Sequence, residues 1–405
     1  MSSKAFRIVS TVKLIHFGST KLILSSLLSL ALISTFSQTI LAAPSPGFIV
    51  NTDLVLTHED NIRRSSDTLK ESDTILAVKP KAEWLVLFGK HQLDLHYKGD
   101  YGRYSDEDIL NYSDHSLKAH GLFDHSYRFN SEFELGAARD HDDPGSTDAI
   151  SATKTNFNEF KRDYAKGKFY YGTAKSIGQF IVELNHSKTR YTNNGQSFRD
   201  YDQDTITGTF FFRIAPATRL LLESAFSEYD YLTGSFDQSN EDQRYLLGLE
   251  WESTAKTTGI FKIGRQNKEY NNTIFDDISG LTLSLDMIWK PNTYTELKLG
   301  ATRDTSESAQ ASAGGFISEY IRAELKHRFT PRTAISAAIS LGDEEFTSSI
   351  GRSDKREDFR IGLEHELRRW LFISTEIRYE SRDSNQNQFD YSANIFMVTI
   401  STKFD

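Results

Sequence analysis

Segments of alternating polarity recur along most of this chain, and they constrain its fold more than any other feature. In the segment 205–214, Ile206 and Phe210 share one face of an extended chain, and Thr207 and Arg213 share the other. A period of two residues places side chains alternately on the two faces of a β-strand, whereas a helix would need a period near 3.6. The alternation therefore predicts strands throughout the chain.

The alternating segments predict eighteen strands. Each predicted strand is about ten to fourteen residues long, as expected for a strand that crosses a membrane at a tilt. The predicted ranges are 48–58, 74–87, 91–104, 112–125, 129–140, 159–172, 179–192, 203–214, 218–230, 243–253, 258–269, 279–289, 294–304, 316–329, 333–342, 357–367, 371–381 and 391–404.

The connections between the predicted strands are alternately short and long. Pro216, Pro291 and Pro331 stand in short connections, where a fixed φ and a missing N–H are tolerated. Thr254 to Thr257 and Arg368-Arg369 form two further short connections, and the connections that alternate with the short ones are long, polar and acidic. These long connections cover 140–158, 231–242, 305–315, 343–356 and 382–390. Short turns at one end and long loops at the other are typical of outer-membrane barrels.

An apolar strand face can lie in lipid only if every backbone edge is paired, because an unpaired amide in hydrocarbon costs several kcal/mol. The sequence therefore predicts an all-β fold: a transmembrane antiparallel up-and-down β-barrel of about 18 strands, with short periplasmic turns and long extracellular loops. A large soluble β-sandwich, solenoid or propeller is the alternative. It would require the apolar faces to pack on each other, and it would not predict the alternation of short and long connections.

The first 42 residues predict a separate unit. They contain four basic residues and no acidic residue, then a Leu-rich apolar stretch at 22–32 and the small residues Ala42 and Ala43. This order predicts a cleaved secretory signal over 1–42 and a barrel over 43–405, with a retained anchor as the alternative. The predicted location is the outer membrane of a Gram-negative cell.

Charge argues against nucleic acid as a partner. The full chain has a net charge of −9, and loss of the four basic residues of 1–42 takes it to −13. A chain this acidic lacks the basic surface that binds phosphate backbones.

The last predicted strand places Phe396, Val398, Ile400 and Phe404 on one face. A terminal strand that ends in an aromatic residue predicts recognition of Phe404 by the barrel-insertion machinery. Asp405 follows Phe404 and departs from that pattern by one residue.

No catalytic motif is found, and no catalytic residue, cofactor or metal is predicted. The chain has no cysteine, and it has no nucleotide-binding or zinc-protease signature, because His365-Glu366 lacks a second histidine. The acidic stretches 140–143 and 343–345 are interpreted as solvated loop charge, and calcium binding is the alternative. Outer-membrane lipid and lipopolysaccharide are the predicted neighbours of these loops.

The residues that alternate with the apolar face predict a charged lumen. A lumen lined by both signs of charge can attract and release a hydrated polymer without trapping it. A plugged, self-paired interior is the alternative, although eighteen strands leave room for an aqueous channel. The candidate lumen-lining residues are Glu250, Glu252, Arg322, Glu324, Lys326, Arg328, Arg360, Glu364, Glu366, Glu376 and Arg378.

Several stretches resemble one family of outer-membrane proteins. They are the segments 57–62, 73–80, 93–97, 248–251, 289–293 and 303–308. Together they resemble the outer-membrane β-barrel porin family found with exopolysaccharide and capsule gene clusters. The resemblance spans nearly all of the chain after residue 42, and it implies a barrel that helps a polysaccharide to leave the cell.

Three functions remain open from the sequence. The first is an outer-membrane porin for exopolysaccharide secretion, with the polysaccharide and periplasmic export components as partners. The second is a general diffusion porin for small solutes. The third is a barrel enzyme that acts on lipid or glycan, which no motif supports.

Overall fold

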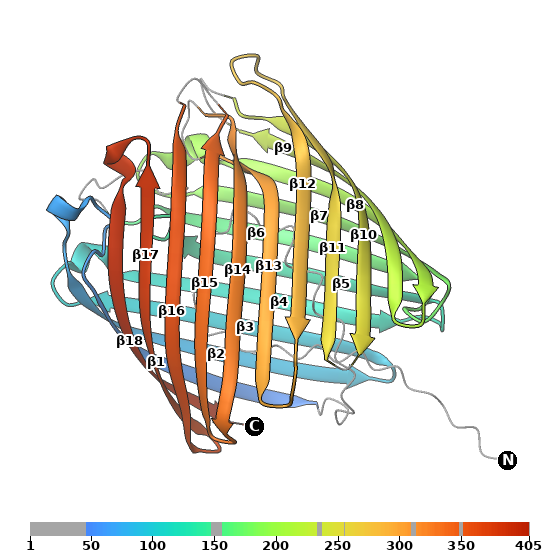
Figure 1. The fold of residues 1–405 in the computed structure, drawn as a ribbon, viewed down its shortest axis with the longest axis horizontal. Helices are drawn as coiled ribbons and strands as arrows, with labels where there is room; N and C mark the ends of the chain where they lie inside the picture. Colours follow the sequence, from blue (N-terminus) through green and yellow to red (C-terminus); the bar gives the residue numbers. More distant parts are fainter. Residues whose placement is uncertain are drawn as a thin grey trace.

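The computed structural model describes residues 46–146, 156–232, 237–254, 256–308, 313–347 and 351–404. Within these residues eighteen strands form one antiparallel sheet, and Figure 1 shows this sheet closed into a barrel. This confirms the predicted transmembrane up-and-down barrel. The predicted signal segment 1–42 lies outside the described residues, and no helix among those described is long and apolar enough to cross a membrane.

Each strand pairs with its neighbours in sequence, and short 3-10 turns lie in four of the connections. The strands are β1 (Gly47–Glu59), β2 (Asp73–Phe88), β3 (His91–Tyr104), β4 (Tyr112–Asp124), β5 (Phe129–His141), β6 (Glu159–Tyr171), β7 (Gly178–Tyr191), β8 (Tyr201–Ala215), β9 (Thr218–Tyr231), β10 (Asn240–Thr254), β11 (Thr257–Tyr270), β12 (Ile278–Trp289), β13 (Thr295–Glu307), β14 (Gly315–Thr330), β15 (Thr333–Phe346), β16 (Ser353–Arg368), β17 (Leu371–Ser384) and β18 (Tyr391–Phe404).

The first and last strands close the barrel. β1 pairs antiparallel with β18, from Val50 opposite Phe404 to Glu59 opposite Ile395. On its other side β1 pairs with β2 over its whole length. The sheet therefore has no free edge, and every strand pairs with a neighbour on both sides, as a lipid environment demands.

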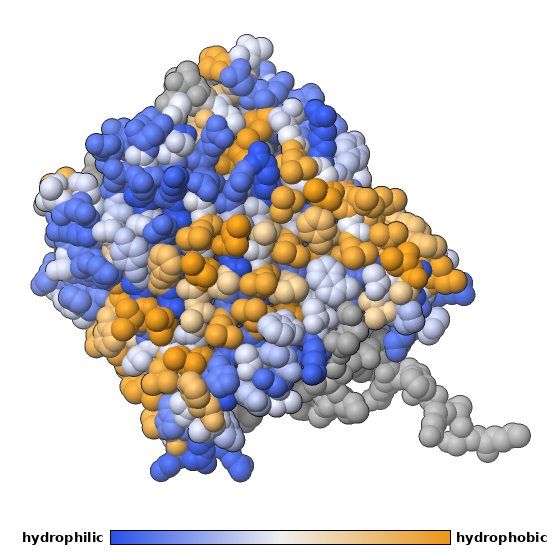
Figure 2. All heavy atoms as spheres, viewed as in Figure 1, coloured by the Kyte–Doolittle hydropathy of each residue, from blue (hydrophilic) through white to orange (hydrophobic). Residues whose placement is uncertain are grey.

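The outer face carries a belt of exposed hydrophobic side chains. Figure 2 shows this belt across the middle of the visible face, with hydrophilic residues above it toward the long connections. Ile361, Leu363 and Leu367 on β16 are typical members, since all three are exposed and alternate with polar residues. An exposed apolar belt of this kind is what hydrocarbon requires of a barrel.

Tryptophan marks the lower border of this belt. Trp84, Trp251 and Trp289 lie near the strand ends that meet the short turns, and the fourth tryptophan, Trp370, lies in the turn between β16 and β17. The Trp370 ring stacks on Phe404, with the ring centroids 5.8 Å apart. Aromatic side chains prefer the boundary between hydrocarbon and water, so these residues define the periplasmic girdle of the barrel.

Four of the short turns share one geometry. The strand register shifts by one residue just before each turn, between Arg213 and Ala215 and at the equivalent places in β10, β14 and β16. Pro216 and Pro331 occupy the first turn position in two of them. A bulge increases the local twist and terminates regular pairing, so it allows a tight reversal of the chain at the barrel rim.

Several strands in the second half of the chain extend beyond their predicted ends on the loop side. β15 runs to Phe346 where residue 342 was predicted, and β16 begins at Ser353 where residue 357 was predicted. The added residues are charged on the outer face, like Glu345 and Lys355. The alternation of apolar and polar residues marks only the part of a strand that lies in lipid. The predicted ranges therefore leave out the strand ends that extend beyond the membrane.

We expect an arginine at Leu363 to destabilise the barrel. Leu363 lies in the middle of the apolar part of β16 and is 48% exposed, so the substitution places a guanidinium in hydrocarbon. The free energy of unfolding into urea from lipid vesicles should fall by about 2–4 kcal/mol. Glu364→Arg, one residue along on the inner face, is the matched control, and an equal loss in that variant would contradict the assignment of the two faces.

Candidate transport lumen

The structure places the predicted lumen residues on the strand face opposite the apolar belt. On β14, Ile321 and Leu325 are exposed on the outer face, and Arg322, Glu324 and Lys326 alternate with them. The same alternation holds for the candidates on β10, β16 and β17. Closure of the barrel places these candidate residues on its inner face. Their role in transport remains a prediction.

Most of these charges are paired between neighbouring strands. On β16 and β17, Asp358 accepts hydrogen bonds from Arg360 Nε at 2.7 Å and from Arg378 Nε at 2.6 Å. Arg378 also pairs with Glu380 at 2.6 Å. A carboxylate shared by two guanidinium groups holds both in place, and Glu380 supplies the second negative charge of the cluster.

The other paired candidates join adjacent strands or strands separated by one other strand. Glu250 receives two hydrogen bonds of 2.8 Å from Arg219, through Nε and Nη2. Lys326 lies 3.4 Å from Glu364 across β15, and Glu324 lies 3.7 Å from Lys298 on β13. These pairs join strands that are one or two positions apart in the sheet.

Five candidates have no ion pair within the part of the chain that the structure describes. Arg322 stacks over the Tyr320 ring, 4.9 Å from its centroid, and its Nε has no hydrogen-bond partner among the described residues. Glu376 Oε1 likewise lacks a described partner. The remaining three lie close to the short-turn rim, and they are Glu252, Arg328 and Glu366.

Glu319 interrupts the apolar side of β14, and the structure explains this exception. Its carboxylate pairs with Arg303, which lies opposite it on the outer face of β13. The pair stands above the apolar belt on the loop side, where strands continue past the hydrocarbon. The strand assignment for 316–329 therefore holds despite the charged residue.

A buried polar cluster inside β9 to β13 was missed by sequence reasoning. Arg244 pairs with Asp242 at 2.7 Å and with Asp304 at 2.8 Å. Lys268 is 1% exposed and pairs with Glu307. Alternation marks these residues as inward-facing, but only the strand register shows which of them meet.

Residues after β5 turn into the mouth of the barrel. The Gly145 carbonyl accepts a hydrogen bond from Arg356 Nη2 at 2.7 Å on β16 and one from Tyr391 Oη at 3.2 Å on β18. Strands β1 to β4 lie between β5 and β18 in the sheet. This part of the loop therefore reaches across the opening to a different section of wall, and we call the contact the mouth latch.

The connection between β1 and β2 supports the mouth latch from the side. Arg64 pairs with Glu59 at 2.8 Å and also with Glu380 on β17. Burial disfavours its charged form, but the Glu380 and Glu59 carboxylates outweigh burial and hold the pKa of Arg64 well above its ordinary value. Arg64 stays charged, so the pairs persist across the physiological pH range.

The acidic stretches considered for calcium are largely engaged with protein. Asp142 pairs with Arg199 at 2.6 Å, and Glu344 lies 3.8 Å from Arg356. Asp114 and Asp140 lie close to His141, with Asp114 Oδ1 3.1 Å from His141 Nδ1. These contacts fit structural ion pairs at the rim, and the predicted absence of a bound metal stays a prediction.

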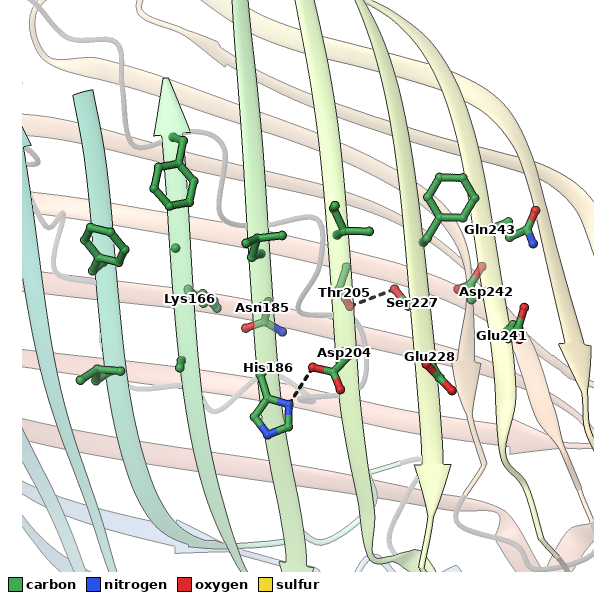
Figure 3. A pocket seen from close by; sticks show the side chains of 18 residues that line it. Lys166, Asn185, His186, Asp204, Thr205, Ser227, Glu228, Glu241, Asp242 and Gln243 are labelled. Atoms are coloured by element: carbon green, nitrogen blue, oxygen red, sulfur yellow. Dashed lines mark hydrogen bonds and ion pairs between the residues drawn. The ribbon is translucent and has the colours of Figure 1, made fainter. Parts of the chain in front are cut away.

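The outer wall has a hollow of about 970 Å³ across β5 to β10. Figure 3 shows the residues that line it, with hydrogen bonds from His186 to Asp204 and from Thr205 to Ser227. Its apolar lining includes the exposed Phe133 and Leu184 of the lipid-facing belt. None of the predicted lumen residues lines it, so it is distinct from the candidate transport path.

Fold and wall chemistry together define a class of protein. A closed eighteen-stranded barrel with an apolar outer belt, an aromatic girdle and a charged interior is an outer-membrane β-barrel porin. Residues 47–404 match the family described as "Putative beta-barrel porin 2", and the chain belongs to that family.

The barrel is similar to solved outer-membrane proteins, and OccK2 agrees with it at the level of the fold. OccK2 of Pseudomonas aeruginosa aligns with a TM-score of 0.50 and 12% identity, covering 88% of this chain and 98% of the other. OccK1 of the same organism gives 0.49 and 12%, covering 88% and 100%. The siderophore receptor PirA of Acinetobacter baumannii gives 0.46 and 7%, covering 89% and 81%. Comparison with functionally curated proteins gave no significant match.

Proposed function

We propose that this porin carries an exopolysaccharide outward across the outer membrane. The observation that supports the proposal most directly is the pairing of opposite charges along the inner wall, as in Arg360 and Arg378 around Asp358. A polymer touches many wall groups at once, and the free energies of these contacts add up. Where the wall charges are paired, each contact with the polymer is weak, so a long hydrated chain can move on.

The resemblance to porins of exopolysaccharide gene clusters supports the same proposal. The overall acidity of the chain is compatible with it, because many acidic residues lie outside the lumen. Examples are Asp67 in the β1–β2 connection and Asp204 and Glu228 on the outer wall. The charge that a polymer meets inside is therefore more balanced than the net charge of −9 indicates.

The proposal is tested by deleting the gene and measuring secreted polymer. We expect secretion to fall in the deletion strain while polymer accumulates in the periplasm, and to return with the full-length gene. Normal secretion by the deletion strain would overturn the export proposal. If purified protein then lets small sugars into liposomes without preference, it acts as a general diffusion porin.

The enzyme alternative has a separate readout. Purified porin incubated with labelled outer-membrane lipid or glycan should release no product. Hydrolysis that a single polar-to-alanine substitution in the lumen abolishes would establish a barrel enzyme instead.

A further inference from the structure

One part of the inner wall departs from the rule that opposite charges are paired. Lys81 on β2 and Lys98 on β3 lie directly opposite each other in the strand register, and both face inward. Side chains in such a pair have Cβ atoms only about 5 Å apart, and like charges there destabilise a sheet. The chain places two ammonium groups where most of its wall places a cation beside an anion.

The carboxylates near Lys98 form ion pairs with other lysines. Lys81 pairs with Asp53 at 2.8 Å, and Lys79 pairs with Asp100 at 3.0 Å. Lys98 has no ion pair or hydrogen bond from its ammonium group among the described residues, and it is exposed to the lumen. It is therefore a lumen cation left for a ligand. Arg322 and Arg328 also lack an ion pair among the described residues, but the strand register places neither of them opposite a second cation.

The surrounding charges reinforce this position. Lys118 on β4 and Lys81 both act electrostatically on Lys98, and Lys118 lies 3.4 Å from Glu134. Glu83, two residues along β2 from Lys81, lies 3.7 Å from His96. A lysine therefore stands opposite Lys98 on β2, and another stands diagonally across from it on β4.

The backbone beside the lysines is also irregular. Pro80 stands in the interior of β2, where it offers no N–H, and the pairing of β2 with β3 is interrupted there and at Gly99. A Cβ at Gly99 would lie 3.2 Å from Pro80 Cγ and 2.8 Å from the Tyr101 ring. Proline is rare inside a central strand. The proline and the interrupted pairing both weaken the sheet at this place. Local features that lower stability are expected at functional sites.

We propose that Lys98, flanked by Lys81 and Lys118, is a binding station for carboxylate groups carried by an acidic polysaccharide. The inference rests on the proposed export function and specifies the chemical class of the polymer. A flexible ammonium group exposed to water binds a carboxylate reversibly, because solvent and salt screen the attraction. One such station can orient a passing polyuronate within a wall that otherwise offers little net charge.

Blockade of single channels tests this station. The purified full-length porin in planar bilayers is exposed to oligogalacturonate and to a neutral maltooligosaccharide of equal length. We expect oligogalacturonate to block the wild-type channel for longer, with blockades that shorten as salt is raised. Lys98→Gln should shorten the oligogalacturonate blockades about tenfold, and Lys98→Arg should retain them.

Lys168→Gln is the matched control. Lys168 also faces inward but is paired with Glu183 at 3.4 Å, so its loss removes the same charge without removing an unpaired cation. Equal shortening in Lys98→Gln and Lys168→Gln would overturn the proposal, because it would indicate a diffuse field. Blockade by inorganic phosphate with none by oligogalacturonate would overturn the assignment to a polymer-borne carboxylate.

Failure of this inference can be told apart from failure of the export proposal. A deletion strain that secretes polymer normally would remove the export function and leave the blockade results standing. Loss of polymer secretion in the deletion strain, together with equal blockade by the two oligosaccharides, would support the export proposal and contradict the carboxylate-binding proposal.

Discussion

Replacement of Gly145 by valine is expected to open the extracellular mouth and raise single-channel conductance. Gly145 has a φ of +72°, and a Cβ there would lie 2.6 Å from Arg64 Cγ and 2.7 Å from Tyr391 Oη. A β-branched residue is strained at this φ by about 1–3 kcal/mol, before either clash is counted. The strain and the clashes arise in the latched arrangement, so the variant should populate an unlatched mouth.

Gly195→Val is the matched control for the mouth latch. Gly195 lies in the connection between β7 and β8 with a φ of +66°, and a Cβ there meets nothing within 4 Å. The control imposes similar backbone strain on a long connection without touching the latch. Planar-bilayer conductance should rise in Gly145→Val alone, and an equal rise in both variants would show that the latch does not limit the current.

Replacement of Lys268 by methionine is expected to destabilise the barrel by about 3–5 kcal/mol. Lys268 is 1% exposed, and it pairs with Glu307 next to the Arg244 cluster. Its ammonium group also lies 5.3 Å from the centroid of the Tyr229 ring. The substitution leaves the largely buried Glu307 carboxylate with Asn240 Nδ2, at 3.2 Å, as its one remaining side-chain donor among the described residues. An uncompensated buried charge is costly.

Urea unfolding in lipid vesicles measures this effect, and two further variants define its cause. Lys268→Met combined with Glu307→Gln should recover part of the lost free energy, because no buried charge is left unpaired. Lys90→Met removes a lysine whose side chain is 52% exposed and lies 3.4 Å from Asp124, and it should cost less than about 1 kcal/mol. A double variant no more stable than the single one would contradict the argument from unpaired charge.

The fold could be predicted from the sequence because lipid imposes a simple rule on every strand. Alternation on β8 and the prolines at 216 and 331 located strands and turns without knowledge of any contact. The strand ends on the loop side could not be placed in the same way. There the outer face is charged, as at Glu345 and Lys355, so the alternation of apolar and polar residues stops before the ladder does.

The inner wall could be predicted only as a set of inward-facing residues. Sequence spacing identifies Arg322 and Arg360 as inward-facing, but it gives no register between strands. The opposition of Lys81 and Lys98, and the approach of Lys326 to Glu364, depend on that register. The mouth latch was equally hidden, because Gly145 and Tyr391 meet only through closure of the whole sheet.

Closure by the last strand also sets an order of assembly. Asn61 Nδ2 donates to the Ser392 carbonyl at 2.9 Å, and Asp60 pairs with Asn394, so the first connection is anchored on β18 as well. Contacts so distant in sequence gain nothing until the ends of the chain have met, because the entropy of closing the loop is paid first. Before β18 has paired with β1, the β1–β2 connection lacks these contacts, and the extracellular opening of the barrel is wider. We therefore expect the opening to become narrow only when the last strand has been inserted.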